Sequence, residues 1–194
     1  MARAPRKQNS DSITPMVAAW RRERPDLDPS PVEILGRVQR LWLHMQRHAV
    51  GGWLEPLGLT WESFSLILTL RRNGPPFQLN PTDIYRESLL TSGAITNRID
   101  RVEKAGWVRR IKDPHDRRGV LVALTPAGRK LADRAVEVHF REMARLFGDL
   151  SKAEAEQLAG LLSRLLLVFE QAPPAATASP IKSPRAGIRQ RAAE

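Results

Sequence analysis

The sequence has no cysteine and no long hydrophobic run. Without cysteine, disulfides, thiolate nucleophiles and cysteine-ligated zinc sites are excluded. No apolar segment approaches the roughly 18 residues that a membrane-spanning helix needs, and the first residues lack the apolar stretch of a secretory signal. We therefore expect a cytoplasmic protein that does not contact a membrane.

The motifs that would indicate an enzyme are also missing. The chain contains no Gly-rich phosphate loop, no G-x-S-x-G and no H-E-x-x-H. His44 and His48 are four residues apart, which is a metal-ligand spacing on a helix, but no third ligand accompanies them. We expect no catalytic residues, no metal site and no cofactor.

Positive charge is concentrated in one part of the chain. The 194 residues include 31 Lys or Arg and 21 Asp or Glu, a net charge of +10. Residues 71–130 hold 13 basic and 6 acidic residues, whereas residues 31–70 are neutral and residues 131–170 have a net charge of −2. A concentrated basic block is typical of nucleic-acid binding, although a solvated basic surface has the same composition.

The N-terminal part predicts a short helix followed by a longer one. Residues 1–12 are polar and aperiodic, which indicates a disordered tail. Thr14 and Pro15 are typical of an N-cap and a first helical position, so a short helix with its linker should occupy residues 13–30. From residue 31 apolar residues recur at helical spacing, and we expect that helix to end at Gly51-Gly52.

The basic block predicts two short helices with a tight joint. After a helix capped by Thr60, Asn80-Pro81 should begin the first of the two, and Thr91 or Ser92 should cap the second. Gly106 is a typical helix stop. This layout is that of a helix-turn-helix.

A β-hairpin should follow directly. The segments Trp107–Ile111 and Val120–Leu124 are rich in strand-forming residues, and turn-forming and cationic residues separate them. A helix-turn-helix followed by a basic hairpin is the winged-helix arrangement, in which the helix enters the major groove and the hairpin reaches the backbone or the minor groove.

The C-terminal part predicts two helices and a tail. Thr125-Pro126 should begin a long helix that runs to about Phe147, and Ser151 with Glu154 forms a capping box for the last helix. That helix carries leucine on nearly all sides, so we expect it to be buried between elements or between subunits of a dimer. Residues 171–194 are rich in Pro, Ala and Ser and indicate a disordered basic tail.

The stretch Asp116–Gly128, with its D-x-R-G and L-T-x-x-G elements, resembles the wing of the MarR (multiple antibiotic resistance regulator) family, and the likeness extends over residues 31–170. It implies a mainly α fold with a small β-hairpin wing. It also implies a homodimer formed by residues 31–58 and 126–170, a winged helix-turn-helix over residues 59–125, and a pseudo-palindromic operator in double-stranded DNA as the partner.

The resemblance implies a recognition helix at about Ser92–Ala105 and a wing tip that reaches the minor groove. A narrow minor groove concentrates negative potential and favours an inserted arginine. Hydroxyl, amide and guanidinium groups of the helix bind base edges or phosphates. The candidate DNA-binding residues are Thr91, Ser92, Thr96, Asn97, Arg98, Arg101, Asp116, Arg117 and Arg118. For the helix residues, capping or a surface role is the alternative.

The added N-terminal helix resembles the urate-responsive subgroup of that family. The likeness implies a ligand site formed by Trp20, Arg98 and Arg110, together with Ser65 at a position where the subgroup has Asp. A serine hydroxyl accepts from ring N–H groups less strongly than a carboxylate does, so a small anionic or aromatic ligand other than urate is expected. The alternative is that Trp20 only anchors packing.

These observations favour a sequence-specific DNA-binding transcriptional regulator, and in particular a ligand-responsive repressor. One alternative is a nonspecific architectural DNA-binding protein, which the basic tails would also suit. Another is a protein-interaction module that has kept the fold without DNA binding.

Overall fold

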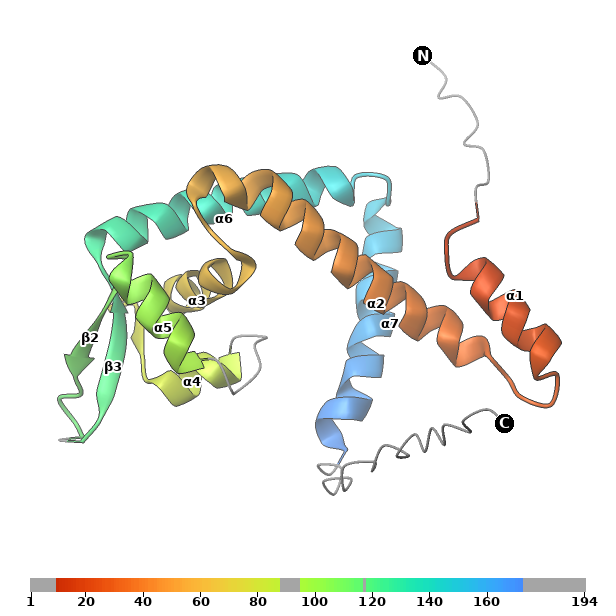
Figure 1. The fold of residues 1–194 in the computed structure, drawn as a ribbon, viewed down its shortest axis with the longest axis horizontal. Helices are drawn as coiled ribbons and strands as arrows, with labels where there is room; N and C mark the ends of the chain where they lie inside the picture. Colours follow the sequence, from red (N-terminus) through yellow and green to blue (C-terminus); the bar gives the residue numbers. More distant parts are fainter. Residues whose placement is uncertain (1–9, 88–94, 117, 173–194) are drawn as a thin grey trace, which may run out of the picture. The chain divides into compact units, whose positions relative to one another are not determined.

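A computed structural model describes residues 10–87, 95–116 and 118–172 (Figure 1). The chain forms two compact units, Met1–Arg145 and Leu146–Glu194. In chain order the elements are α1 (Thr14–Glu23), α2 (Ser30–His48), η1 (Ala49–Leu54), η2 (Glu55–Leu57), α3 (Trp61–Arg72), β1 (Gln78–Leu79), α4 (Pro81–Glu87), α5 (Ile95–Lys104), β2 (Val108–Lys112), β3 (Val120–Leu124), α6 (Pro126–Leu146) and α7 (Lys152–Gln171). The mainly helical fold with a small β wing is therefore confirmed.

The N-cap position of α1 is Ile13, so the prediction that Thr14 is the N-cap is wrong, and the carboxylate of Asp11 bonds to the first amides of the helix. The Asp11 carboxylate accepts hydrogen bonds from the backbone amides of Ile13 (2.9 Å) and Thr14 (3.0 Å), while Thr14 is the first helical residue. Its other oxygen accepts from Nε of Arg37 in α2 at 2.8 Å. One carboxylate thus bonds both to the start of α1 and to α2. Asp11 belongs to residues 1–12, for which the sequence predicted a disordered tail.

The helix α2 continues past His48 into η1, a π-helical turn that contains Gly51 and Gly52. The prediction that these glycines end the helical path is wrong. The wide turn brings Trp53 and Leu54 into the core, where 8% and 0% of their surface remains exposed. Burial of these two apolar side chains outweighs the preference of glycine for a helix end. The path ends at Gly58, whose φ of 67° is left-handed.

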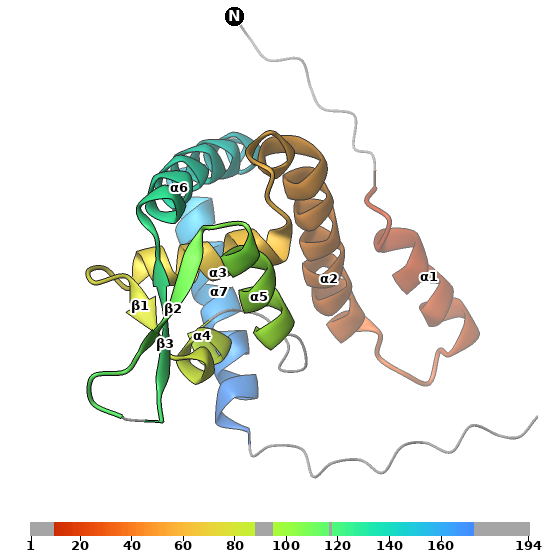
Figure 2. The same ribbon diagram turned by 60° about the vertical axis from the view of Figure 1, so that its left-hand side comes forward.

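The core of the first unit lies between α3, α4, α5 and the sheet, which are adjacent in both views (Figures 1 and 2). The helix α3 starts as expected at an N-cap, since Thr60 Oγ1 accepts from the Ser63 amide at 3.2 Å. The largest fully buried side chains near this centre are Phe64, Leu66, Ile67, Leu70, Ile84, Ile99, Val102, Val108 and Val122. They fix the orientation of α5 relative to the hairpin.

The sheet has the order β1-β3-β2 and is antiparallel throughout. In the predicted hairpin, Val108 pairs with Leu124 and Lys112 pairs with Val120. The two-residue strand β1, which pairs Gln78 with Ala123, was not predicted. A strand this short has no detectable period, so the sequence pattern contains no signal for it.

The start of α6 packs closely against the turn between α5 and β2, which contains Gly106 and Trp107. As predicted, Thr125 caps this helix: its Oγ1 accepts from the Gly128 amide at 3.0 Å, and it also donates to the carbonyl of Gly106 at 2.7 Å. A Cβ at Gly128 would lie 1.8 Å from the carbonyl oxygen of Trp107. Only glycine allows this approach of α6 to the strand β2.

The second unit is built around α7. Its predicted capping box is present, because the Ser151 hydroxyl and the Glu154 carboxylate each accept from the other's backbone amide. The hydrogen bonds from Ser151 lower the pKa of Glu154. Seven of its large apolar side chains are exposed within the described chain, namely Leu158, Leu161, Leu162, Leu166, Leu167, Val168 and Phe169.

Candidate nucleic-acid interface

The helix α5 presents one polar face to solvent. Ile99 and Val102 are buried, while Thr96, Asn97 and Arg101 are exposed. This arrangement follows from helical periodicity, since residues three and four apart share a face. The expected caps Thr91 and Ser92 lie outside the described residues. Three of the candidate DNA-binding side chains on α5 are therefore free to meet a partner.

Arg98 is placed differently from its neighbours. The residue is half-buried, and its Nη1 atom is buried without a hydrogen-bond partner among the described residues. An unsatisfied guanidinium N–H is costly, because a buried donor without an acceptor loses the hydrogen bonds that water supplied. Arg98 is thus partly withdrawn from the polar face that Thr96, Asn97 and Arg101 share.

The wing loop is held by its own aspartates. The Asp116 carboxylate accepts from the Arg118 amide at 2.9 Å, and the Asp113 carboxylate accepts from the His115 amide at 2.8 Å. A Cβ at Gly119 would lie 2.9 Å from Cβ of Asp113, so glycine allows this tight closure. Arg118 is exposed and has no carboxylate partner among the described residues. Arg117 lies outside them.

Arg110 joins the strand β2 to the helix α5. Its guanidinium donates to Asp100 at 2.5 Å and also to the carboxylate of Glu103. Glu103 accepts a second bond from the Arg110 backbone amide at 2.8 Å. The hydrogen bond to Asp100 is the main cause that raises the pKa of Arg110, and that to Glu103 adds to it. Sequence reasoning missed both acidic partners.

The four candidate ligand residues are not brought together within one chain. Ser65 of α3 and Arg98 of α5 are on helices that pack together, and Arg110 follows on β2. Trp20 is half exposed and lines a separate hollow of about 240 Å³ with Arg24, Leu27, Pro29 and Val32. In both views α2 lies between α1 and α5 (Figures 1 and 2).

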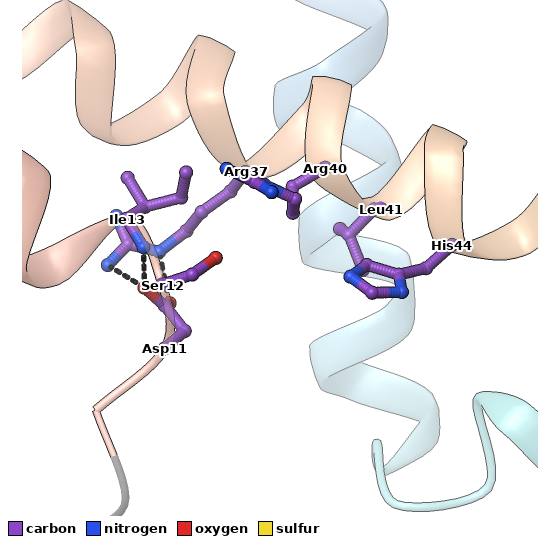
Figure 3. Close-up of a pocket in the computed structure, with 7 residues that line it drawn as sticks. All are labelled: Asp11, Ser12, Ile13, Arg37, Arg40, Leu41 and His44. Atoms are coloured by element: carbon purple, nitrogen blue, oxygen red, sulfur yellow. Dashed lines mark hydrogen bonds and ion pairs between the residues drawn. The ribbon is translucent and has the colours of Figure 1, made fainter.

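A further hollow of about 400 Å³ lies between the start of α1 and the outer face of α2 (Figure 3). Arg37 reaches across it to the Asp11 carboxylate, while Leu41 and His44 line its other end. The hydrogen bond from the Thr14 amide and that from Arg37 lower the pKa of Asp11 to about 2. The sequence does not reveal this pair, because 26 residues separate its members.

The described residues contain no group of three His, Asp or Glu side chains placed to hold a metal ion. No described helix is long and apolar enough to cross a membrane.

Comparisons with known proteins agree on a family. The model of the MarR family matches residues 59–120. The regulator PecS of Dickeya dadantii is 35% identical over 153 residues, which cover 79% of this chain and 92% of PecS. The multiple antibiotic resistance protein MarR of Escherichia coli is 27% identical over 133 residues, which cover 68% of this chain and 90% of MarR.

Solved structures show the same fold. A mutant of MarR from E. coli, complexed with operator DNA, has a TM-score of 0.60 and 25% identity, with 76% of this chain and 97% of that chain covered. The organohalide-sensing regulator RdhR, bound to 2,4-dichlorophenol, has a TM-score of 0.66 at 18% identity, with 81% and 92% of the two chains covered. The second likeness concerns the fold alone.

Proposed function

This chain belongs to the MarR family of winged-helix, DNA-binding transcription regulators, and we propose that it acts as a cytoplasmic homodimer that recognises a pseudo-palindromic operator. It is a regulator and not an enzyme. The proposed action is repression, by an operator placed where the bound dimer would exclude the transcription machinery. The observation that carries the proposal is that Arg101 on the polar face of α5 and Arg118 in the wing loop are both exposed and have no carboxylate partner among the described residues.

The chemistry of these elements supports duplex binding. Thr96, Asn97 and Arg101 offer hydroxyl, amide and guanidinium groups on one face of α5. Such groups bind base edges in the major groove and phosphates beside it. Arg118, whose loop is held by Asp116, suits the narrow minor groove. The solved operator complex of MarR supports this reading by homology.

Exposed apolar surface supports the homodimer. On α2 the side chains of Ile34, Leu35, Val38 and Leu41 are 42–56% exposed, in addition to those of α7. A monomer rarely leaves so much apolar surface in water. Full burial of one such side chain contributes about 1.5–3 kcal/mol, so a few of them suffice to hold two protomers together. Two protomers would place two α5 helices for two half-sites about one DNA turn apart.

The Nη1 atom of Arg98, which has no hydrogen-bond partner among the described residues, supports a ligand site where α5 packs on α3, the helix of Ser65. A small anionic or aromatic ligand would supply the missing acceptor, and it would compete with Asp100 and Glu103 for Arg110. Release of Arg110 would loosen β2 from α5 and separate the two DNA-binding elements. Ligand and operator would then favour different conformations, which is the requirement for coupling between two sites. Ser65 makes urate a poorer ligand than an anion without ring N–H groups.

Selection of duplexes from a random library, followed by fluorescence anisotropy, tests the proposal. We expect enrichment of a two-fold symmetric site and a preference of roughly 10³-fold or more over random DNA at physiological salt. The nonspecific architectural alternative predicts no enrichment and an affinity that depends on salt alone. A library that returns no shared sequence would reject the proposed operator recognition.

A further inference from the structure

A basic hollow of about 530 Å³ lies at the base of the wing, where β1, the β2–β3 hairpin and the start of α6 meet. Its lining includes Phe77, Arg109, Thr125, Arg129 and Lys130, and also one acidic residue, Asp133. Neither the proposed operator contacts nor the proposed ligand residues belong to it. The volume is in the range of sites that hold small molecules.

The ring of Phe77 orders the cations of this hollow. The guanidinium carbon of Arg71 lies 5.0 Å from the ring centroid and that of Arg129 lies 4.7 Å from it. Both distances are those of cation–π contacts. Arg71 also donates to Asp133 at 2.5 Å, so its charge is neutralised. Arg129 is instead held in place by the ring alone, since it has no carboxylate partner among the described residues.

The alternation of side chains along β2 directs the guanidinium of Arg109 toward the same hollow. Successive residues of a strand point to opposite faces. Because Arg110 faces α5 and bonds there to Glu103, its neighbour Arg109 faces away from α5, toward the hollow that it lines. Arg109, Arg129 and Lys130 are exposed and have no acidic partner in the described chain. The first turn of α6 contains no acidic residue either.

This concentration of cations has an electrostatic cost that a ligand can remove. Like charges held close together repel, and here the positive end of the α6 dipole adds to them. An anion that enters the hollow relieves that repulsion and accepts from guanidinium groups that are already oriented. Three unneutralised cations match a ligand with two or more negative charges better than a monoanion.

The hollow is separate from the surface proposed to bind the operator. β2 is five residues long, so its first and last residues are four steps, or about 13 Å, apart at roughly 3.3 Å per residue. Arg109 lies near the end next to α6, whereas Arg118 lies in the loop at the other end. The hollow and the wing tip are therefore at opposite ends of β2.

We propose that this hollow, formed by Phe77, Arg109, Arg129 and Lys130, binds a small organic polyanion that carries either phosphate or paired carboxylate groups. Bound there, the polyanion joins β2 to the first turn of α6. The site is independent of the operator and of the ligand proposed near Arg98, so its failure in an experiment would leave the DNA-binding proposal intact.

Calorimetric titration of the full-length protein tests this site with pyrophosphate, succinate and, as a monoanion control, acetate at equal ionic strength. We expect a Kd below about 1 mM for at least one dianion and no saturable binding of acetate. Binding of pyrophosphate alone would assign a phosphate ligand, and binding of both dianions would assign a site for paired charges. Absence of saturable binding of either dianion would overturn the proposal.

Variants locate the binding. Combined Arg109→Gln and Arg129→Gln substitutions should weaken dianion binding by at least about tenfold, with Lys130→Gln as a second variant if that protein folds poorly. Arg134→Gln, at an exposed position further along α6, and Arg118→Gln, in the wing, are the matched controls and should leave dianion affinity unchanged. Equal loss in Arg118→Gln would overturn the assignment. A loss of duplex affinity in the Arg109 and Arg129 variant would do the same, because the hollow would then be a DNA contact.

Discussion

Arg110 donates to Asp100 across 2.5 Å, and through this bond the strand β2 is fixed to the helix α5. The two residues belong to the two elements that we propose to contact DNA together. The buried core sets their relative orientation, and this ion pair, with the second carboxylate of Glu103, adds a restraint at the surface. The pair is partly exposed to solvent, with 33% of the Arg110 side chain and 55% of the Asp100 side chain accessible, so its net contribution to stability is small.

We expect Arg110→Gln to reduce operator affinity more than it reduces stability. Loss of a partly exposed ion pair costs about 1 kcal/mol or less of unfolding free energy. The same change frees the wing to move relative to α5, so binding must restrain it again at an entropic cost. Chemical denaturation and fluorescence anisotropy measure the two effects. Arg109→Gln, on the opposite face of β2, is the matched control, and an equal loss of operator affinity in that variant would contradict the expectation.

Arg118→Ala should weaken binding to the operator by about 1–3 kcal/mol, if its guanidinium lies in the minor groove as proposed. The loss has an electrostatic part, so the dependence of affinity on salt should also become less steep. Anisotropy at several salt concentrations measures both quantities. Arg134→Ala removes the same charge from an exposed position in the middle of α6 and serves as the control. Unchanged affinity in Arg118→Ala would favour a protein-interaction module over a DNA-binding regulator.

The parts of this fold that sequence reasoning predicted are those that depend on neighbours in the chain. The caps Thr60, Thr125 and Ser151 act on amides three residues away, and the residue types alone identify them. The exposed face of α5 follows in the same way from its period. Local chemistry was sufficient in each case.

The features that were missed depend on residues far apart in the chain. Asp11 bonds to the start of α1, and Arg37, 26 positions later, holds the same carboxylate. Arg110 looked available to a ligand because the carboxylates of Asp100 and Glu103 face it only after α5 has packed beside β2. The π-helical turn likewise results from burial of Trp53, which is a tertiary effect. Short-range patterns contain no signal for any of these.

Gly128→Ala should destabilise the protein strongly. The added Cβ would lie 1.8 Å from the backbone carbonyl oxygen of Trp107. Rotation of a side chain cannot relieve this clash, because the oxygen belongs to the backbone and the Cβ is attached directly to it. Relief requires α6 to move away from β2, which costs more than the roughly 1–3 kcal/mol of ordinary overpacking. Gly160→Ala, in α7, is the control, because its Cβ would meet nothing within 4 Å and should stabilise the helix by about 0.5–1 kcal/mol. Thermal unfolding of both variants distinguishes a local clash from a general effect of helical glycine.

Stability should fall below neutral pH because of His139. Burial lowers the pKa of this residue, whose ring packs on Phe64 at 5.0 Å and whose Nδ1 has no partner among the described residues. The unfolded state therefore binds a proton more readily than the folded state does. The stabilising effect is complete above the unfolded pKa of about 6.5 and is lost as the pH falls toward the lower folded pKa. Urea denaturation between pH 7.5 and 5 measures this loss.

Replacement of His139 isolates its share of the pH dependence. His139→Phe keeps an aromatic ring against Phe64 and removes the titrating group, so its unfolding free energy should vary less over the same range of pH. The control is His48→Gln, at an exposed position of α2, which should keep the pH dependence of the parent protein. If His139→Phe and the parent lose stability in parallel as the pH falls, another group is responsible.

A charge placed in the apolar face of α7 should separate the proposed dimer. Leu162 is 39% exposed within the described chain, and a second protomer that covers it would bury a glutamate carboxylate in Leu162→Glu. An unpaired buried charge costs several kcal/mol, which exceeds the gain from any single apolar contact at the interface. Sedimentation equilibrium should therefore show a dimer for the parent protein and a monomer for this variant.

The core of the first unit contains no residue of α7, so the monomeric variant should keep its helical circular dichroism. It should nevertheless bind operator DNA weakly, because one α5 reads only one half-site. Arg164→Glu changes charge by two units at an exposed position of the same helix and tests whether charge alone is responsible. A parent protein that sediments as a monomer would remove the basis for a symmetric operator, since two half-sites need two recognition helices.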